Sequence, residues 1–117
     1  MFYVYHNHIG STEEMYWFTQ YYLSDIKIWP SIKAAVRFYE DEELLTILEE
    51  VEHIVISRNQ LEDGSYKEAR PSDIEGDAEL ASAIQPIYHK YVESAPRLIS
   101  KMNTYVTQHF TEFIEIV

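Results

Sequence analysis

The feature that most constrains the fold is a run of aliphatic residues at helical spacing behind a capping aspartate. Those residues fall at positions i, i+1, i+4 and i+7 of one pattern: Leu44, Leu45, Leu48 and Val51. This is the pattern of an amphipathic helix with one buried face. Asp41 is a favourable N-cap, and the acids that follow it lie where the helix dipole stabilises negative charge. The sequence therefore predicts a helix over residues 41–51.

Aromatic residues crowd the N-terminal third, where eleven of the 17 precede residue 40. Aromatic and β-branched residues favour strands, and Gly10-Ser11-Thr12 is typical of a turn. We expect antiparallel strands over residues 2–9 and 15–23. A third strand over residues 34–39 follows an irregular piece around Trp29-Pro30. The second strand carries rings on both faces, so either both faces are covered within the fold or the sheet presents aromatic rings to a partner.

An Asp-Gly pair predicts a hairpin in the middle of the chain. Strands over residues 54–61 and 66–69 flank Asp63-Gly64, a strong type I′ turn signal. A two-residue loop would place Leu61 opposite Tyr66, which is a favourable cross-strand pair.

Helical spacing returns over residues 77–117. Asp77 is the expected cap of a first helix, Pro86 should kink it, and Pro96 suits the start of a second helix. Phe110–Val117 is expected to be helical, with a strand as the alternative. The fold class predicted is α+β, a single domain of residues 1–117. An antiparallel sheet of about five strands packs against helices in the order β-β-β-α-β-β-α-α, with a two-helix C-terminal part from about residue 77.

Composition excludes several classes of function. The chain has no Cys, so disulfides, thiolate metal sites and cysteine nucleophiles are absent. It has three Gly, none in a phosphate-binding motif, and no G-x-S-x-G sequence. No apolar run reaches the ~20 residues of a membrane span, and the N-terminus does not resemble a signal peptide. We expect a cytoplasmic, non-enzymatic protein with no catalytic residues, no cofactor and no membrane partner.

Histidines offer one alternative. His6 and His8 lie two residues apart, so on a strand both rings would point the same way and could reach one metal ion. Glu49 and His53 lie four apart on the predicted helix, which suits a salt bridge or half a metal site. Neither pair has a third ligand fixed by the sequence. No metal site is therefore expected, and a small metal-binding protein or enzyme built on His6 and His8 ranks third.

Charge is concentrated in the middle of the chain. Residues 40–95 hold 15 acids and four bases, which accounts for the whole net charge of −11. The acids expected to form a binding face are Glu42, Glu43, Glu49, Glu50, Glu62 and Asp63. Such a face disfavours direct nucleic-acid binding, which needs a basic surface, and favours a basic protein partner. The leading hypothesis is an acidic protein that mimics nucleic acid and occupies the basic, nucleic-acid-binding cleft of that partner.

Aromatic surfaces offer the second alternative, because Tyr and Trp are enriched at interfaces. The rings expected to form this face are Tyr3, Tyr5, Tyr16 and Tyr22. A wide apolar stripe over Leu98–Val117 adds to the apolar area that a monomer would expose. These features predict self-association as a homodimer, and a structural or assembly role.

One stretch resembles a family of proteins. A short aromatic hairpin precedes Trp29, Ala34 or Ala35, and Phe38, and the acidic helix start Glu42-Glu43-Leu44-Leu45 follows. This order resembles small uncharacterised proteins of tailed phages and prophages, over roughly a quarter of the chain. The resemblance implies a mobile-element origin and action by binding host proteins, as an inhibitor would. It implies no catalytic or binding residue.

Overall fold

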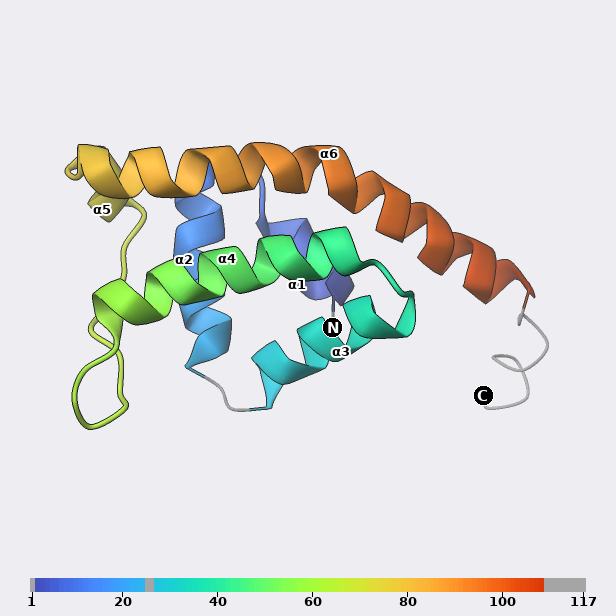
Figure 1. Ribbon diagram of the computed structural model, residues 1–117, viewed down its shortest axis with the longest axis horizontal. Helices are drawn as coiled ribbons and strands as arrows, with labels where there is room; N and C mark the ends of the chain where they lie inside the picture. Colours follow the sequence, from blue (N-terminus) through green and yellow to red (C-terminus); the bar gives the residue numbers. More distant parts are fainter. Residues whose placement is uncertain (1, 25–26, 109–117) are drawn as a thin grey trace.

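The chain folds into helices. A computed structural model describes residues 2–24 and 27–108, and 79% of these residues are helical (Figure 1). The helices are α1 (Phe2–His8), α2 (Thr12–Leu23), α3 (Ile28–Phe38), α4 (Glu42–Asn59), α5 (Ser72–Glu75) and α6 (Ala78–Gln108). That part of the chain contains no strand or sheet. The predicted α+β class is therefore wrong, and the molecule is all-α.

The aromatic segments are helices rather than the strands predicted over residues 2–9, 15–23 and 34–39. In α2 the buried positions follow a helical period: Met15, Tyr16, Thr19, Gln20 and Tyr22. Positions that would lie on both faces of a strand therefore lie on one broad face of this helix. Trp17 and Tyr21 lie outside that face and are exposed. The expected turn is a helix cap, since Ser11 Oγ accepts a hydrogen bond from the Glu14 N–H at 3.1 Å.

Two further strand predictions fail in the middle of the chain. α4 continues to Asn59 because Val55 and Asn59 extend the buried face that begins at Leu44. Beyond α4, Gln60 and Tyr66 form a single antiparallel bridge, one position away from the predicted Leu61–Tyr66 pair. Gly64 adopts a φ of 88°, which glycine tolerates at the tip of this turn. The remaining residues to Pro71 lack regular structure, so a turn forms without a hairpin of strands.

The C-terminal pattern forms one helix, not two, within the described residues. α6 includes Pro86 and Pro96, both exposed, while its buried side follows an unbroken helical period. The buried residues are Leu80, Ile84, Ile87, Tyr91, Ser94, Ala95 and Leu98. The later part of α6 is inclined to the earlier part (Figure 1), as expected where proline removes a backbone hydrogen bond. The prediction for Phe110–Val117 lies outside the described residues.

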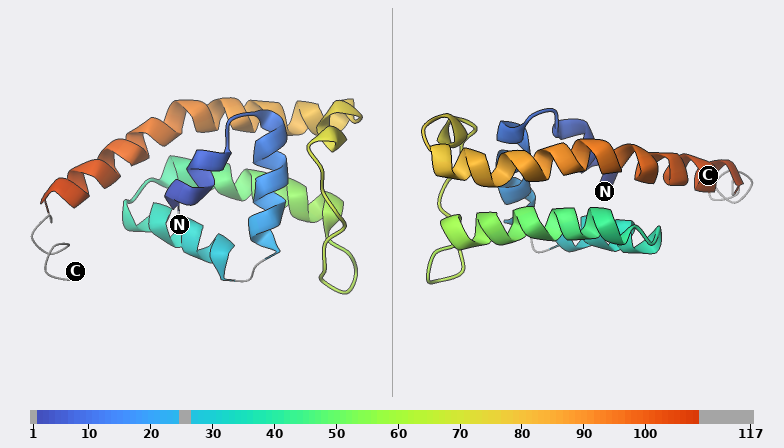
Figure 2. Two further views of the ribbon diagram at one scale, coloured as in Figure 1. Left: turned by 180° about the vertical axis from the view of Figure 1, so that it is seen from behind. Right: turned by 45° about the horizontal axis from the view of Figure 1, so that its top comes forward.

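The helices form two layers around one core. α4 and α6 run antiparallel side by side in both figures, and α1, α2 and α3 lie on one side of this pair (Figure 2). α2 packs on α4 and α6, and α3 packs on α4. Between the layers lie aromatic rings from the first helices and aliphatic side chains from the last ones. The segment with the excess of acids therefore builds one layer of the molecule and its adjoining loop.

Candidate protein-binding surface

The acidic layer consists of residues 40–95, which are α4, the loop over residues 60–71, α5 and the first part of α6. It carries the whole net charge of −11, while residues 1–39 are neutral. Its exposed carboxylates without an ion pair in the described part of the chain are Glu40, Glu42, Glu49, Glu62, Asp63, Glu75, Glu79 and Glu93. These groups remain hydrated and available to a cationic partner.

The six predicted acidic residues differ in their surroundings. Glu43 accepts a hydrogen bond from Ser94 Oγ at 3.0 Å, and one of its oxygens lies 3.5 Å from an Arg97 nitrogen. Glu50 pairs with Lys90 at 3.6 Å. Both acids are thus partly neutralised by α6. Glu42 and Glu49 are exposed on the same helix without such partners.

The other two predicted acids lie in the loop at the far end of α4. Glu62 is exposed. The Asp63 carboxylate accepts hydrogen bonds from the Ser65 hydroxyl at 2.6 Å and the Ser65 N–H at 3.0 Å, which lower the pKa of Asp63. Since the 18 residues of α4 span about 27 Å, the six acids form a band along the layer and not a compact cluster.

A groove crosses the acidic layer where α4 meets α6. It measures about 470 Å³ and is lined by Thr46, Glu49, Glu50, His53, Ile54 and Ile87. Ile87 and Ile54 give it an apolar floor, and Glu49 stands at its rim. An apolar floor beside a carboxylate suits the aliphatic stem and charged head of Lys or Arg. The predicted Glu49–His53 pair thus borders this groove.

Asp41 anchors the acidic layer to α6. Its carboxylate accepts hydrogen bonds from the Leu44 N–H at 3.1 Å and from Arg97 Nη2 at 2.7 Å. Burial alone would raise the pKa of Asp41, but the hydrogen bonds from Arg97 and Leu44 outweigh it and hold the pKa below the ordinary 3.8. Sequence analysis identified the cap at Asp41 but not its partner, because Arg97 is 56 residues away.

The aromatic residues predicted as a binding face lie largely in the core. Tyr5, Tyr16 and Tyr22 are buried, and the side chain of Tyr3 lies outside the described part. The strand interpretation placed these rings on a surface because it alternated faces every second residue. Among the residues whose side chains the structure describes, the exposed Trp, Tyr and Phe residues are Trp17 and Tyr21 on α2 and Phe38 at the end of α3.

A buried polar network was missed by sequence analysis. Asn59 Nδ2 donates hydrogen bonds to Tyr16 Oη at 2.9 Å and to Gln20 Oε1. Tyr16 Oη donates to Asp73, and Gln20 Nε2 donates to the Lys67 carbonyl. Burial, opposed by the hydrogen bond from Asn59, raises the pKa of Tyr16. The network ties the loop and α5 to α2 and α4, so its role is structural. The sequence signal for this network was Asn59, a polar residue at the end of the apolar face of α4.

His6 and His8 do not converge, because residues two apart on a helix point in different directions. His6 Nδ1 lies 2.8 Å from Tyr91 Oη, whereas the His8 ring stacks on Phe18 at 4.6 Å. The predicted strand geometry for a shared metal ion is therefore wrong. Among residues 2–24 and 27–108, no three His, Asp or Glu side chains are grouped to hold a metal ion.

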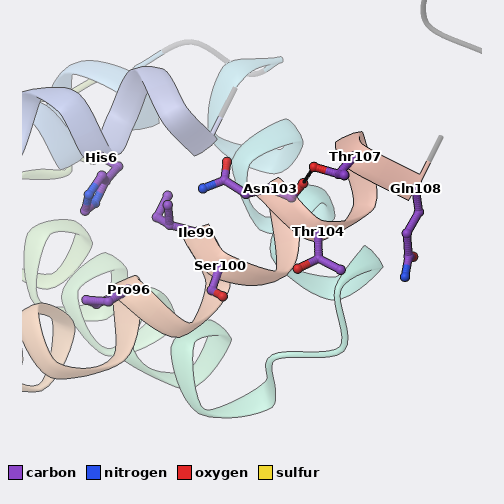
Figure 3. Close-up of a pocket in the computed structure, with 8 residues that line it drawn as sticks. All are labelled: His6, Pro96, Ile99, Ser100, Asn103, Thr104, Thr107 and Gln108. Atoms are coloured by element: carbon purple, nitrogen blue, oxygen red, sulfur yellow. Dashed lines mark hydrogen bonds between the residues drawn. The ribbon is translucent and has the colours of Figure 1, made fainter. Parts of the chain in front are cut away.

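A cavity of about 750 Å³ lies between His6 and the later part of α6. Figure 3 shows His6 reaching from α1 toward a row of α6 side chains. These are Pro96, Ile99, Ser100, Asn103, Thr104, Thr107 and Gln108. Among the described residues that line this cavity there is no carboxylate and no Lys or Arg.

The stability of the protein should fall as the pH decreases below 6.5. Partial burial lowers the pKa of His6, so the unfolded chain takes up a proton at a higher pH than the folded chain does. The contribution of His6 is present above its ordinary pKa of 6.5 and is lost as the pH falls through the lowered value. Urea unfolding at about pH 7.5 and about pH 5.5 measures this loss. A His6→Gln variant should lose less stability over the same interval, and an equal loss would contradict the prediction.

Neither a membrane span nor a relative is found. None of the described helices combines the length and the hydropathy needed to cross a bilayer. The chain matches no protein-family model, no curated protein and no solved structure.

Proposed function

We propose that this protein acts by binding a basic protein through the acidic layer, without catalysis. The observation that carries the proposal is the segregation of charge: one layer holds the net −11 and the other is neutral. A layer of one charge raises the association rate with an oppositely charged surface and disfavours acidic partners.

The arrangement of the acids supports a partner whose cleft holds nucleic acid. Carboxylates follow the length of α4, with Glu42 and Glu49 one heptad apart, about 10 Å along the helix axis. Charges repeated along a rigid rod resemble the spaced phosphates of a nucleic-acid backbone.

Removing charge from α4 should weaken partner binding. In Glu42→Gln/Glu49→Gln both carboxylates without internal partners are lost, so the helix and its contacts with α6 are preserved. We expect affinity for a captured partner to fall about three- to tenfold at about 0.05 M salt, mainly through the association rate. The difference should disappear near 0.5 M salt, where charges are screened within about 4 Å. Surface plasmon resonance on the immobilised chain measures the affinity and the association rate at both salt concentrations.

The matched control adds the same charge to the other layer. Ser31 and Ala34 are exposed on α3, so Ser31→Lys/Ala34→Lys changes the net charge by +2, as the glutamine variant does. This control should bind almost as the wild type does, and duplex DNA should displace the partner from both proteins. Equal loss in the two variants, or binding that does not depend on salt, would refute the acidic layer as the binding surface.

A further inference from the structure

The turn over residues 61–65 contains the Asp63-Gly64 pair, the one place in this sequence where Gly follows Asp or Asn. An aspartyl link to glycine reacts faster than other aspartyl links, because glycine has no side chain to shield its amide nitrogen. Asp63 is exposed, and a Cβ at Gly64 would meet no atom within 4 Å. In the described part of the chain, neither burial nor a neighbouring side chain therefore shields this link.

The reaction open to this pair is formation of a succinimide. The Gly64 nitrogen attacks Cγ of Asp63 and an N–Cγ bond forms, while the amide hydrogen and the hydroxyl of the protonated carboxyl group leave together as water. A second water molecule then opens the ring at either carbonyl. Opening at the main-chain carbonyl of Asp63 leaves the chain running through Cγ. This isoaspartyl link makes the backbone longer by one methylene group.

Three hydrogen bonds hold the reacting groups in the folded chain. The Gly64 N–H donates to the Leu61 carbonyl at 3.0 Å. Asp63 Oδ1 accepts from the Ser65 hydroxyl at 2.6 Å and from the Ser65 N–H at 3.0 Å. The bonds from Ser65 lower the pKa of Asp63, so less of the protonated, reactive acid is present. Both the attacking nitrogen and the carboxyl group are therefore held by other partners.

The turn is also closed at its base. The Leu61 N–H donates to the Ser65 carbonyl at 2.7 Å, and Gln60 forms the antiparallel bridge with Tyr66. The turn therefore opens only when several hydrogen bonds break together, as in local unfolding. A backbone longer by one methylene group between Leu61 and Ser65 would not match the spacing of these bonds.

We propose that Asp63-Gly64 is a latent isomerisation site that the closed turn protects, with the Ser65 hydroxyl as a protecting group. While the turn is closed, the Gly64 N–H and the Asp63 carboxylate are both held, and succinimide forms slowly. When the turn opens, both groups are released and an isoaspartyl link forms. This link is then a lasting chemical mark of loop opening. The proposal does not depend on the function proposed for the acidic layer.

Incubation at neutral pH in water enriched in heavy oxygen tests the site, since each ring opening transfers one solvent oxygen to residue 63. Peptide mapping by mass spectrometry locates the label and measures its rate of uptake. We expect the full chain unfolded in guanidinium chloride to gain label at Asp63 at least about tenfold faster than the folded chain, because three hydrogen bonds are lost. Asp73 and Asp77 precede Ile and Ala, so they should gain almost no label in either state.

Variants of Ser65 test the protecting group. Ser65→Ala removes the 2.6 Å hydrogen bond and should accelerate labelling of the folded chain about two- to tenfold. Ser65→Thr keeps the hydroxyl and should gain label as the wild type does. Both variants should keep the helical circular dichroism, because Ser65 is exposed.

Three results would overturn the proposal. Absence of label in the unfolded chain would remove the site itself. Equal rates in the folded and unfolded wild type would show that the turn does not protect it. Equal rates in the wild type and Ser65→Ala, or in the two Ser65 variants, would exclude the hydroxyl as a protecting group.

Discussion

Replacing Tyr5 with alanine should lower the free energy of unfolding by about 3–5 kcal/mol, the range for deleting a large buried ring. The Tyr5 side chain has no exposed surface. Its ring centroid lies 5.5 Å from that of Trp29, 6.0 Å from that of Tyr91 and 6.2 Å from that of Tyr22. The substitution removes one ring from each of these contacts and leaves a cavity at the junction of α1, α2, α3 and α6. Urea unfolding followed by circular dichroism measures the change.

Two companion variants assign the loss to the ring. Tyr5→Phe keeps the ring and removes only the 2.9 Å hydrogen bond to Thr19, so it should cost about 1 kcal/mol. Tyr21→Ala should cost less than about 1 kcal/mol because that ring is exposed. If Tyr5→Ala were as mild as Tyr21→Ala, Tyr5 would lie on a surface and the helical packing of α1 would be wrong.

Asp41→Ala should lower the free energy of unfolding by about 2–4 kcal/mol, because it removes a helix cap together with charge-assisted hydrogen bonds. The Asp41 carboxylate caps α4 at the Leu44 N–H and binds Arg97 of α6. Arg97 is partly exposed, so water can solvate it after the substitution, and the loss stays below that of breaking a fully buried ion pair. Thermal and urea unfolding at neutral pH measure the effect.

The pH dependence of the same site provides a control. The pKa of Asp41 is below 3.8 in the folded chain, so its stabilising effect is complete above the unfolded value and is lost as the pH falls through the lowered pKa. Asp41→Asn keeps a capping oxygen but cannot titrate. The stability difference between wild type and Asp41→Asn should therefore shrink between about pH 6 and about pH 3. A constant difference would show that the charge of Asp41 does not contribute.

The sequence predicts local structure correctly where a capping residue is followed by apolar residues at helical spacing. Asp41 caps α4 as predicted, and Leu44, Leu48 and Val51 are buried. Asp77 also caps its helix, with its carboxylate 3.0 Å from the Leu80 N–H. In each case the capping carboxylate accepts a hydrogen bond from the backbone N–H three residues later. This interaction is local, so it does not depend on the rest of the fold.

The aromatic segments were misread because their preference for strands is weak and depends on what covers the rings. Tyr5, Tyr16 and Tyr22 favour a strand only while no helical layer is available to bury them. Once α4 and α6 provide that layer, a helical period places these rings inside and leaves Trp17 and Tyr21 outside. Ser11 and Glu14 carried the competing signal, a capping box, which the aromatic pattern outweighed.

The sequence by itself determined the acidic segment, the absence of cysteine chemistry and the first part of the buried α4 face, from Leu44 to Val51, since all of these follow from composition and short-range spacing. Only the tertiary structure decided which acids stay unpaired. Glu43 meets Ser94 and Arg97, and Glu50 meets Lys90, across two helices whose pairing no local pattern specifies. It also decided that the backbone carbonyl of Lys67 accepts a hydrogen bond from Gln20 of α2, which joins residues far apart in the chain. Such contacts depend on how the helices pack on one core, and that packing is a property of the whole chain.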